Sequence, residues 1–413
     1  MISLNWGGRC IIARPRTGRA AARHPVPRSH GPGSQSMKPA IWRERFPWLI
    51  LAAAGTLVCV GWLGIARCDE LIGSGTRFVR LQMVWSVVAA AAMVAVAIPG
   101  YRTLGRWAYV IFLLALGLLV LVYFSPPVNG ARRWIRFGPI GLQPSEFAKI
   151  AFVLALARYL MYRENYRSLA GLLLPLGLTL LPVVLILREP DLGTALVFLP
   201  VMFVMLFAAG ARRIDLARLV LAGLMALPLL WTQMNLEQKS RVTALFEQAG
   251  PGQRATGDAY HLRQAKQMLA LGGVRGSLWT GQIVDDPAAY HLPEARSDFV
   301  FCVLGERFGL PGIAVVLGLF ALLVWRGLAV AAATREPFGR LVAVGLVTLI
   351  AVEVLINTGM TVGLLPITGL SLPLVSYGGS GLVARGLVLG LLVNIALRPG
   401  YEMTNETFRY VVE

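Results

Sequence analysis

The segment His291-Leu-Pro-Glu-Ala-Arg-Ser-Asp298-Phe-Val-Phe-Cys302, residues 291–302, runs from a charged loop directly into a long apolar stretch. The apolar stretch continues to about residue 325, which is long enough for a helix to cross the hydrocarbon core of a bilayer. A carboxylate at the edge of such a helix is costly unless it pairs with another group or takes part in function. Asp298 is therefore the first candidate functional residue.

The composition of the whole sequence is that of an integral membrane protein. Of its 413 residues, 56% are hydrophobic and only 15% are charged, and the mean hydropathy is +0.65. These values exclude an ordinary soluble globular protein. Most of the Lys and Arg residues behind the net charge of +18 lie in short clusters between apolar runs or in the first 45 residues. No basic stripe is interleaved with aromatic residues, so we interpret this charge as a topology signal and predict no nucleic-acid binding.

Ten apolar runs, each close to the length that crosses a bilayer, follow the N-terminal region. Membrane-spanning backbone that faces lipid must satisfy its own hydrogen bonds, so the runs are expected to be helices. The sequence therefore predicts an all-α integral membrane protein with about ten transmembrane helices and one long extracytoplasmic loop. The runs are at about 47–66, 81–99, 105–124, 142–161, 169–187, 192–209, 216–234, 299–325, 341–360 and 379–397.

The predicted membrane domain, residues 46–398, lies between two tails. Residues 1–45 are rich in Arg and nearly free of acidic residues, which predicts a disordered basic cytoplasmic tail, and Met37 within them is a candidate alternative start. With that tail inside, the other Arg-bearing connections also face the cytoplasm, as does a C-terminal tail at residues 399–413. Both termini are then cytoplasmic. The outward-facing loops are those at 125–141, 235–298 and 361–378.

The first outward loop carries Arg132, Arg133 and Arg136, although positive charge is disfavoured on this side. One interpretation is that these arginines, with Trp134, anchor the loop to lipid headgroups. The other is that they bind a phosphate-bearing substrate, because guanidinium groups match phosphate oxygens. Glu146 and Lys149 follow at the start of the next helix, three residues apart on one face, where they are expected to pair.

The long outward loop, 235–298, contains a second candidate element. Leu262, Ala265 and Met268 recur at helical intervals, which predicts a short amphipathic helix over 260–271 on the outer surface, and Gly272-Gly273 ends it. Lys266, on another face of that helix, is a candidate substrate-binding residue.

The end of that loop leaves two questions open. His291 and Glu294 are spaced for metal binding, but a proline separates them and no third ligand is evident, so no metal site is assigned. Asp298 has two possible roles. As a cap, its side-chain carboxylate would accept hydrogen bonds from the first backbone N–H groups of the following helix. As a general base, it would need partial burial to raise its pKa. Further on, Gly309 and Pro311 are expected to bend that helix.

The third outward loop, within 357–381, repeats Gly and Pro at membrane depth. Such irregular backbone is tolerated only where protein or a wet cavity covers it. Gly378 and Gly379 allow another group to approach the backbone closely. With Ser376, they are candidate substrate-binding residues.

Four motifs in this sequence resemble those of the SEDS family (shape, elongation, division and sporulation), which includes RodA and FtsW. They are 133–149 (RWIRFGPIGLQPSEFAK), 189–194 (EPDLGT), 291–301 (HLPEARSDFVF) and the Gly/Pro-rich segment 363–380. The match extends over about 45–398, with the motifs in the family's order.

The resemblance implies a peptidoglycan glycosyltransferase in the bacterial cytoplasmic (inner) membrane. It implies that the enzyme polymerises lipid II on the outer face and works with a class B penicillin-binding protein. Asp298 matches the family's loop aspartate, taken as the base that activates the acceptor hydroxyl, and Glu146 and Lys149 match its functional polar pair. No cofactor is assigned, and a divalent cation such as Mg²⁺ is the only one left open. An elongation role is favoured over a division role.

A transporter of a lipid-linked precursor is the rival class, because buried charges and broken helices suit a carrier as well. The position of Asp298 at the outer surface favours the enzyme, since a carrier would hold its key charge near the bilayer midplane.

Overall fold

The computed structural model describes residues 47–73, 75–127, 131–138, 140–162, 170–246, 257–281 and 292–400. The predicted tail at 1–45 and most of the one at 399–413 lie outside these ranges, as do His291 and the connection 163–169. All structural statements below concern the described residues.

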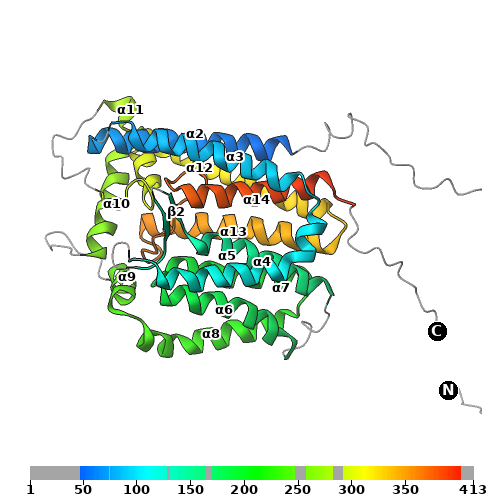
Figure 1. The fold of residues 1–413 in the computed structure, drawn as a ribbon. Helices are drawn as coiled ribbons and strands as arrows, with labels where there is room; N and C mark the ends of the chain where they lie inside the picture. The colour runs from blue at the N-terminus through cyan, green and yellow to red at the C-terminus, as the bar shows by residue number, and fades with distance from the viewer. Residues whose placement is uncertain are drawn as a thin grey trace, which may run out of the picture. The chain divides into compact units, whose positions relative to one another are not determined.

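Long helices dominate these residues, as predicted (Figure 1). Nine are long and apolar enough to cross a membrane. A tenth, α5, has 19 residues, but its sequence includes Glu146, Lys149 and Arg158. The prediction of an all-α membrane protein is confirmed. The ten helices are α2 (Trp48–Ile72), α3 (Arg77–Ala97), α4 (Tyr101–Leu121, extended by η1, Val122–Phe124), α5 (Pro144–Tyr162), α6 (Leu173–Arg188, preceded by η3, Ala170–Leu172), α7 (Leu192–Ala209), α8 (Arg213–Gln233), α12 (Val300–Ala333), α13 (Pro337–Val362) and α14 (Gly379–Leu397).

The centre of the bundle is formed by α13, α14 and α5. In the apolar windows of α13 and α14, 78% of the residues are buried, whereas in α8 only 6% are. The apolar residues of α8 therefore face outward, as expected for a helix in contact with lipid. α14 packs most closely on α3, where small residues let the two backbones approach. A Cβ at Gly386 would lie 2.3 Å from the carbonyl oxygen of Ala89.

Shorter elements lie at one end of the bundle (Figure 1). They are the antiparallel hairpin of β1 (Ile135–Phe137) and β2 (Ile140–Leu142), and the helices α9 (Leu236–Phe246), α10 (Asp258–Gly272) and α11 (Ser277–Thr280). The predicted helix at 260–271 is α10. It runs across the end of the bundle and buries Leu262, Ala265 and Met268.

The backbones of α10 and α12 approach each other closely at two glycines, Gly272 and Gly305. A Cβ at Gly272 would lie 2.0 Å from the carbonyl oxygen of Gly305 in α12. α12 bends at Gly309, whose φ of 64° and ψ of −159° are not helical, as predicted from its Gly and Pro residues. The bend and the close contact hold the long loop against the mouth of the bundle, beside the segment that carries Asp298.

Candidate functional site

A cavity of about 540 Å³ opens at this end of the bundle, and all three predicted outward loops contribute to its wall. It brings together five of the residues predicted from the sequence: Arg133, Glu146, Asp298, Gly378 and Gly379. The other lining residues are Trp85, Ala131, Trp134, Gly141, Gln143, Asp191, Thr194, Glu237, Arg241, Glu294, Ser297, Gly369, Leu370, Ser371, Tyr377 and Gly381.

Asp298 lies in a tight turn between the long loop and α12. The backbone N–H of Asp298 donates to the carbonyl oxygen of Glu294 at 3.0 Å, and Glu294 adopts a left-handed φ of 52°. The side-chain amide of Asn357 donates to the carbonyl oxygens of Asp298 (2.8 Å) and Leu370 (2.6 Å). A residue of the buried α13 therefore fixes this turn. The cap interpretation is wrong, because the N-cap of α12 is Phe299 and no side chain caps it.

The carboxyl group of Asp298 is suited to accept a proton. Burial, and to a lesser extent the nearby charge of Glu294, raise its pKa to about 6. A hydrogen bond from Ser297 and the positive charge of Arg241 oppose that shift. A carboxylate with this pKa is ionised at neutral pH yet is a stronger base than an exposed aspartate, which is what general-base catalysis needs.

Arg296, two residues before Asp298, attaches the turn to the last turn of α2 and the first turn of α3. Its Nε lies 3.1 Å from Oδ1 of Asp69, and its guanidinium carbon lies 4.0 Å from the centre of the Phe78 ring. Its carbonyl oxygen accepts a hydrogen bond from the N–H of Tyr377 at 2.9 Å. The second oxygen of Asp69 caps α3 through the N–H groups of Phe78 and Val79. Arg296 thus connects three separate segments beside Asp298.

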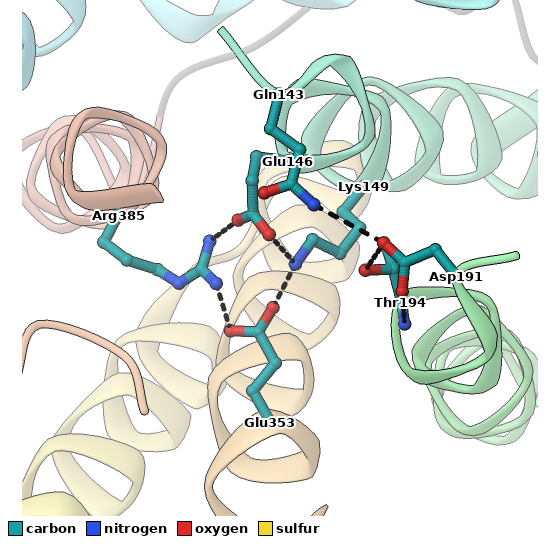
Figure 2. Close-up of polar contacts among 7 residues, drawn as sticks. All are labelled: Gln143, Glu146, Lys149, Asp191, Thr194, Glu353 and Arg385. Carbon is teal, nitrogen blue, oxygen red and sulfur yellow. Dashed lines mark hydrogen bonds and ion pairs between the residues drawn. The ribbon is translucent and has the colours of Figure 1, made fainter. Parts of the chain in front are cut away.

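Glu146 and Lys149 belong to a closed ring of four buried charges (Figure 2). Lys149 Nζ lies 2.9 Å from Glu146 and 2.5 Å from Glu353, and Arg385 lies 2.5 Å from Glu146 and 2.8 Å from Glu353. The predicted Glu146–Lys149 pair is confirmed. The ring has no net charge, which lowers the cost of burying it, and it ties α5, α13 and α14 together below the cavity.

The three arginines of the first outward loop do not converge on one site. Arg133 donates to the carbonyl oxygens of Glu189 (2.9 Å) and Pro190. Arg132 is exposed and donates to the carbonyl oxygen of Tyr123 at 2.7 Å. Arg136 is exposed on β1. Only Arg133 lines the cavity, with part of its guanidinium engaged by backbone.

The model of one protein family, FTSW_RODA_SPOVE, described as a cell cycle protein, matches residues 44–399. This chain belongs to that family. It is 34% identical over 367 residues to a probable peptidoglycan glycosyltransferase FtsW of Geobacter metallireducens, covering 86% of this chain and 96% of the relative. It is 38% identical over 299 residues to the peptidoglycan glycosyltransferase MrdB of Escherichia coli K12, covering 71% and 79%.

Solved structures of the family share the fold. One, described as structural coordination of polymerization and crosslinking by a peptidoglycan synthase complex, has a TM-score of 0.70 and 31% identity, covering 85% of this chain and 97% of that chain. The rod shape determining protein RodA of Thermus thermophilus has a TM-score of 0.63 and 29% identity, covering 86% and 98%. Because FtsW proteins are among the relatives too, the preference for an elongation role stays a prediction.

Ser376 and Lys266, like Arg132, Arg136 and Lys149, do not line the cavity. The hydroxyl of Ser376 accepts a hydrogen bond from the N–H of Leu372 at 2.8 Å, so it stabilises the loop. Lys266 packs beside Gly363, where a Cβ would lie 2.5 Å from its Cε. Trp85 explains why residue 379 is a glycine, because a Cβ at that position would lie 2.4 Å from the indole ring.

Sequence reasoning missed Glu353, Arg385 and Arg241. The first two had a usable signal, since each is a lone charge inside an apolar run, and such residues are functional candidates by default. Arg241 had none, because it is one of several charged residues in a long polar loop. No group of three or more His, Cys, Asp or Glu suited to a metal occurs among the described residues, and His291 of the proposed pair lies outside them.

Proposed function

We propose that this chain is a peptidoglycan glycosyltransferase that polymerises lipid II on the outer face of the bacterial cytoplasmic membrane. One observation carries the proposal: Asp298, with its pKa raised to about 6, lines a cavity at the mouth of a helical bundle in a chain of this family. In this proposal the membrane domain is 46–398 and both termini are cytoplasmic. The meeting of the three predicted outward loops at one cavity supports that topology.

Asp298 acts as the general base of the reaction. Its carboxylate accepts the proton of the acceptor sugar's 4-hydroxyl while the oxygen of that hydroxyl attacks the anomeric carbon of the donor sugar. The bond from that carbon to the pyrophosphate oxygen breaks, and the electron pair leaves with undecaprenyl pyrophosphate. Attack from the face opposite the leaving group inverts the anomeric configuration.

The turn around Asp298 supplies the rigidity that this step requires. Asn357 holds the carbonyl oxygen of Asp298, and Arg296 anchors the segment just before it to Asp69. Because reacting groups must be held in a narrow range of geometries, such anchoring contributes directly to the rate. The charge ring fixes the relative positions of α5, α13 and α14. Of these helices, α5 contributes Glu146 and α14 contributes Gly379 and Gly381 to the cavity wall.

A class B penicillin-binding protein is the proposed partner. The similarity to a chain from a peptidoglycan synthase complex that coordinates polymerization and crosslinking, with a TM-score of 0.70, supports it. A transpeptidase beside the cavity would receive the glycan strand as it forms.

The test is reconstitution of the purified protein with the penicillin-binding protein of its own organism and lipid II in vesicles. The proposal predicts glycan strands, seen as a ladder of products by gel electrophoresis. In parallel, fluorescent lipid II on the inner leaflet reports transport. Translocation without strand synthesis would contradict the proposal and favour the rival carrier function.

A further inference from the structure

Arg241, on α9, has a guanidinium group whose hydrogen bonds are incomplete. Its Nη2 lies 2.7 Å from Oε1 of Glu237, but Nε and Nη1 are buried and have no hydrogen-bond partner. The side chain is 14% exposed. Buried donors without acceptors cost free energy, most of all on a charged group. Three N–H groups of Arg241, a residue of the cavity wall, therefore lack an acceptor within the protein.

One of these donors, Nη1, lies near a space beside the proposed base. The position that a Cβ would take at Gly369 lies 3.4 Å from Oδ2 of Asp298 and 4.0 Å from Nη1 of Arg241. Gly369 adopts a left-handed φ of 70°, which favours glycine. Apart from its neighbours in the chain, no atom lies closer to this position than Oδ2 of Asp298. A group bound between Asp298 and Arg241 would thus have the proton acceptor on one side and a positive charge on the other.

Three other cations near the cavity have some of their donors, or their charge, engaged within the protein. Arg133 donates Nε and Nη2 to backbone carbonyls. Lys149 and Arg385 are neutralised by Glu146 and Glu353 within the charge ring. Glu237 has a side chain that is 55% exposed, so its pairing with Arg241 is weak and mainly orients the guanidinium.

We propose that Arg241 binds the pyrophosphate of the lipid-linked donor, in place of the arginine clamp predicted from the first outward loop. This inference rests on the proposed function. As the glycosidic carbon–oxygen bond breaks, negative charge grows on the departing pyrophosphate oxygen, and the N–H groups of Arg241 stabilise it. The base and the leaving-group ligand then come from opposite ends of the same long loop.

The experiment compares the full-length protein and its variants in vesicles that contain lipid II and its penicillin-binding partner. Strand synthesis is measured with increasing undecaprenyl pyrophosphate or undecaprenyl monophosphate as inhibitor. Arg241→Ala should weaken inhibition by the pyrophosphate about ten- to a hundredfold, the value of a hydrogen bond to a charged group, and weaken inhibition by the monophosphate less. Arg241→Lys should lie between, because it keeps the charge without the fixed fork.

Arg275→Ala is the matched control, since Arg275 is an exposed residue of the same loop that does not line the cavity. It should behave as the unchanged protein. If Arg241→Ala does not yield folded protein, Arg241→Gln, which keeps a donor but not the charge, is measured instead. Unchanged inhibition by the pyrophosphate in a folded variant, whatever its turnover, would overturn the inference. Absence of strands with the unchanged protein would instead overturn the proposed function.

Discussion

The buried charge ring of Glu146, Lys149, Glu353 and Arg385 allows a quantitative test. Replacing Arg385 with Met removes two ion pairs, at 2.5 and 2.8 Å, and leaves two buried carboxylates to share Lys149. Breaking a buried pair by removing one partner costs about 3–5 kcal/mol, because the remaining charge is uncompensated. We expect Arg385→Met to lower the free energy of unfolding by that amount.

A second substitution separates charge from packing. Adding Glu353→Met to Arg385→Met restores a neutral interior that holds only the Glu146–Lys149 pair. Since replacing a whole buried pair with apolar residues is often neutral or stabilising, the double variant should regain about 2 kcal/mol or more. Unfolding would be followed by tryptophan fluorescence during titration with a denaturing detergent in mixed micelles.

The control is Arg218→Met, which breaks the Arg218–Asp215 pair at 2.9 Å on α8, where the Arg218 side chain is 60% exposed. Exposed pairs contribute about 0–1 kcal/mol. The reasoning would be refuted if Arg385→Met lowered the free energy of unfolding no more than the control does. It would also be refuted if the loss in the double variant equalled the sum of the losses in Arg385→Met and Glu353→Met alone.

Three further outcomes are expected. The rate of strand synthesis should fall about tenfold per pH unit below about pH 6, because protonation of Asp298 removes the base. Glu294→Gln should move this fall in rate to lower pH, since the Glu294 charge raises the pKa of Asp298. An unchanged pH profile in that variant would count against this account. Arg296→Met should lower kcat about ten- to a hundredfold. It should also speed amide hydrogen exchange over residues 292–298, because the ion pair with Asp69 is lost. Unchanged hydrogen exchange would refute the positioning role of Arg296. Gly272→Val should destabilise the fold by about 1–3 kcal/mol, since its Cβ would meet Gly305 of α12, whereas Gly55→Ala, with open space around it, should be nearly neutral in thermal unfolding.

The helices were predictable because each one depends on the local sequence alone. An apolar run near 20 residues has only one way to satisfy its backbone in lipid, so each of the ten runs corresponds to a helix. The largest differences are at the ends of α2 and α12, which extend to Ile72 and Ala333. The helix at α10 and the bend at Gly309 followed from local periodicity and from Gly and Pro in the same way.

The site was only partly predictable, because pairing across helices is not encoded locally. The Glu146–Lys149 pair, three residues apart, could be predicted. Its partners come from much later helices, with Glu353 204 residues after Lys149 and Arg385 239 residues after Glu146. The charge of the arginines in the first outward loop predicts phosphate binding. In the structure, however, Arg132 and Arg133 donate hydrogen bonds to backbone carbonyl oxygens. Charge in a sequence shows what a residue can bind, while only packing shows which donors remain free.

Strand synthesis by the Asp298→Asn variant tests the central claim most directly. The variant and its partner protein would be placed with lipid II in vesicles beside the unchanged chain and Asp258→Asn, which changes a carboxylate on α10 that does not line the cavity. We predict that Asp298→Asn makes no strands although it still folds, and that Asp258→Asn makes them normally. Strands made by Asp298→Asn at the rate of the unchanged protein would contradict the role of Asp298 as the base.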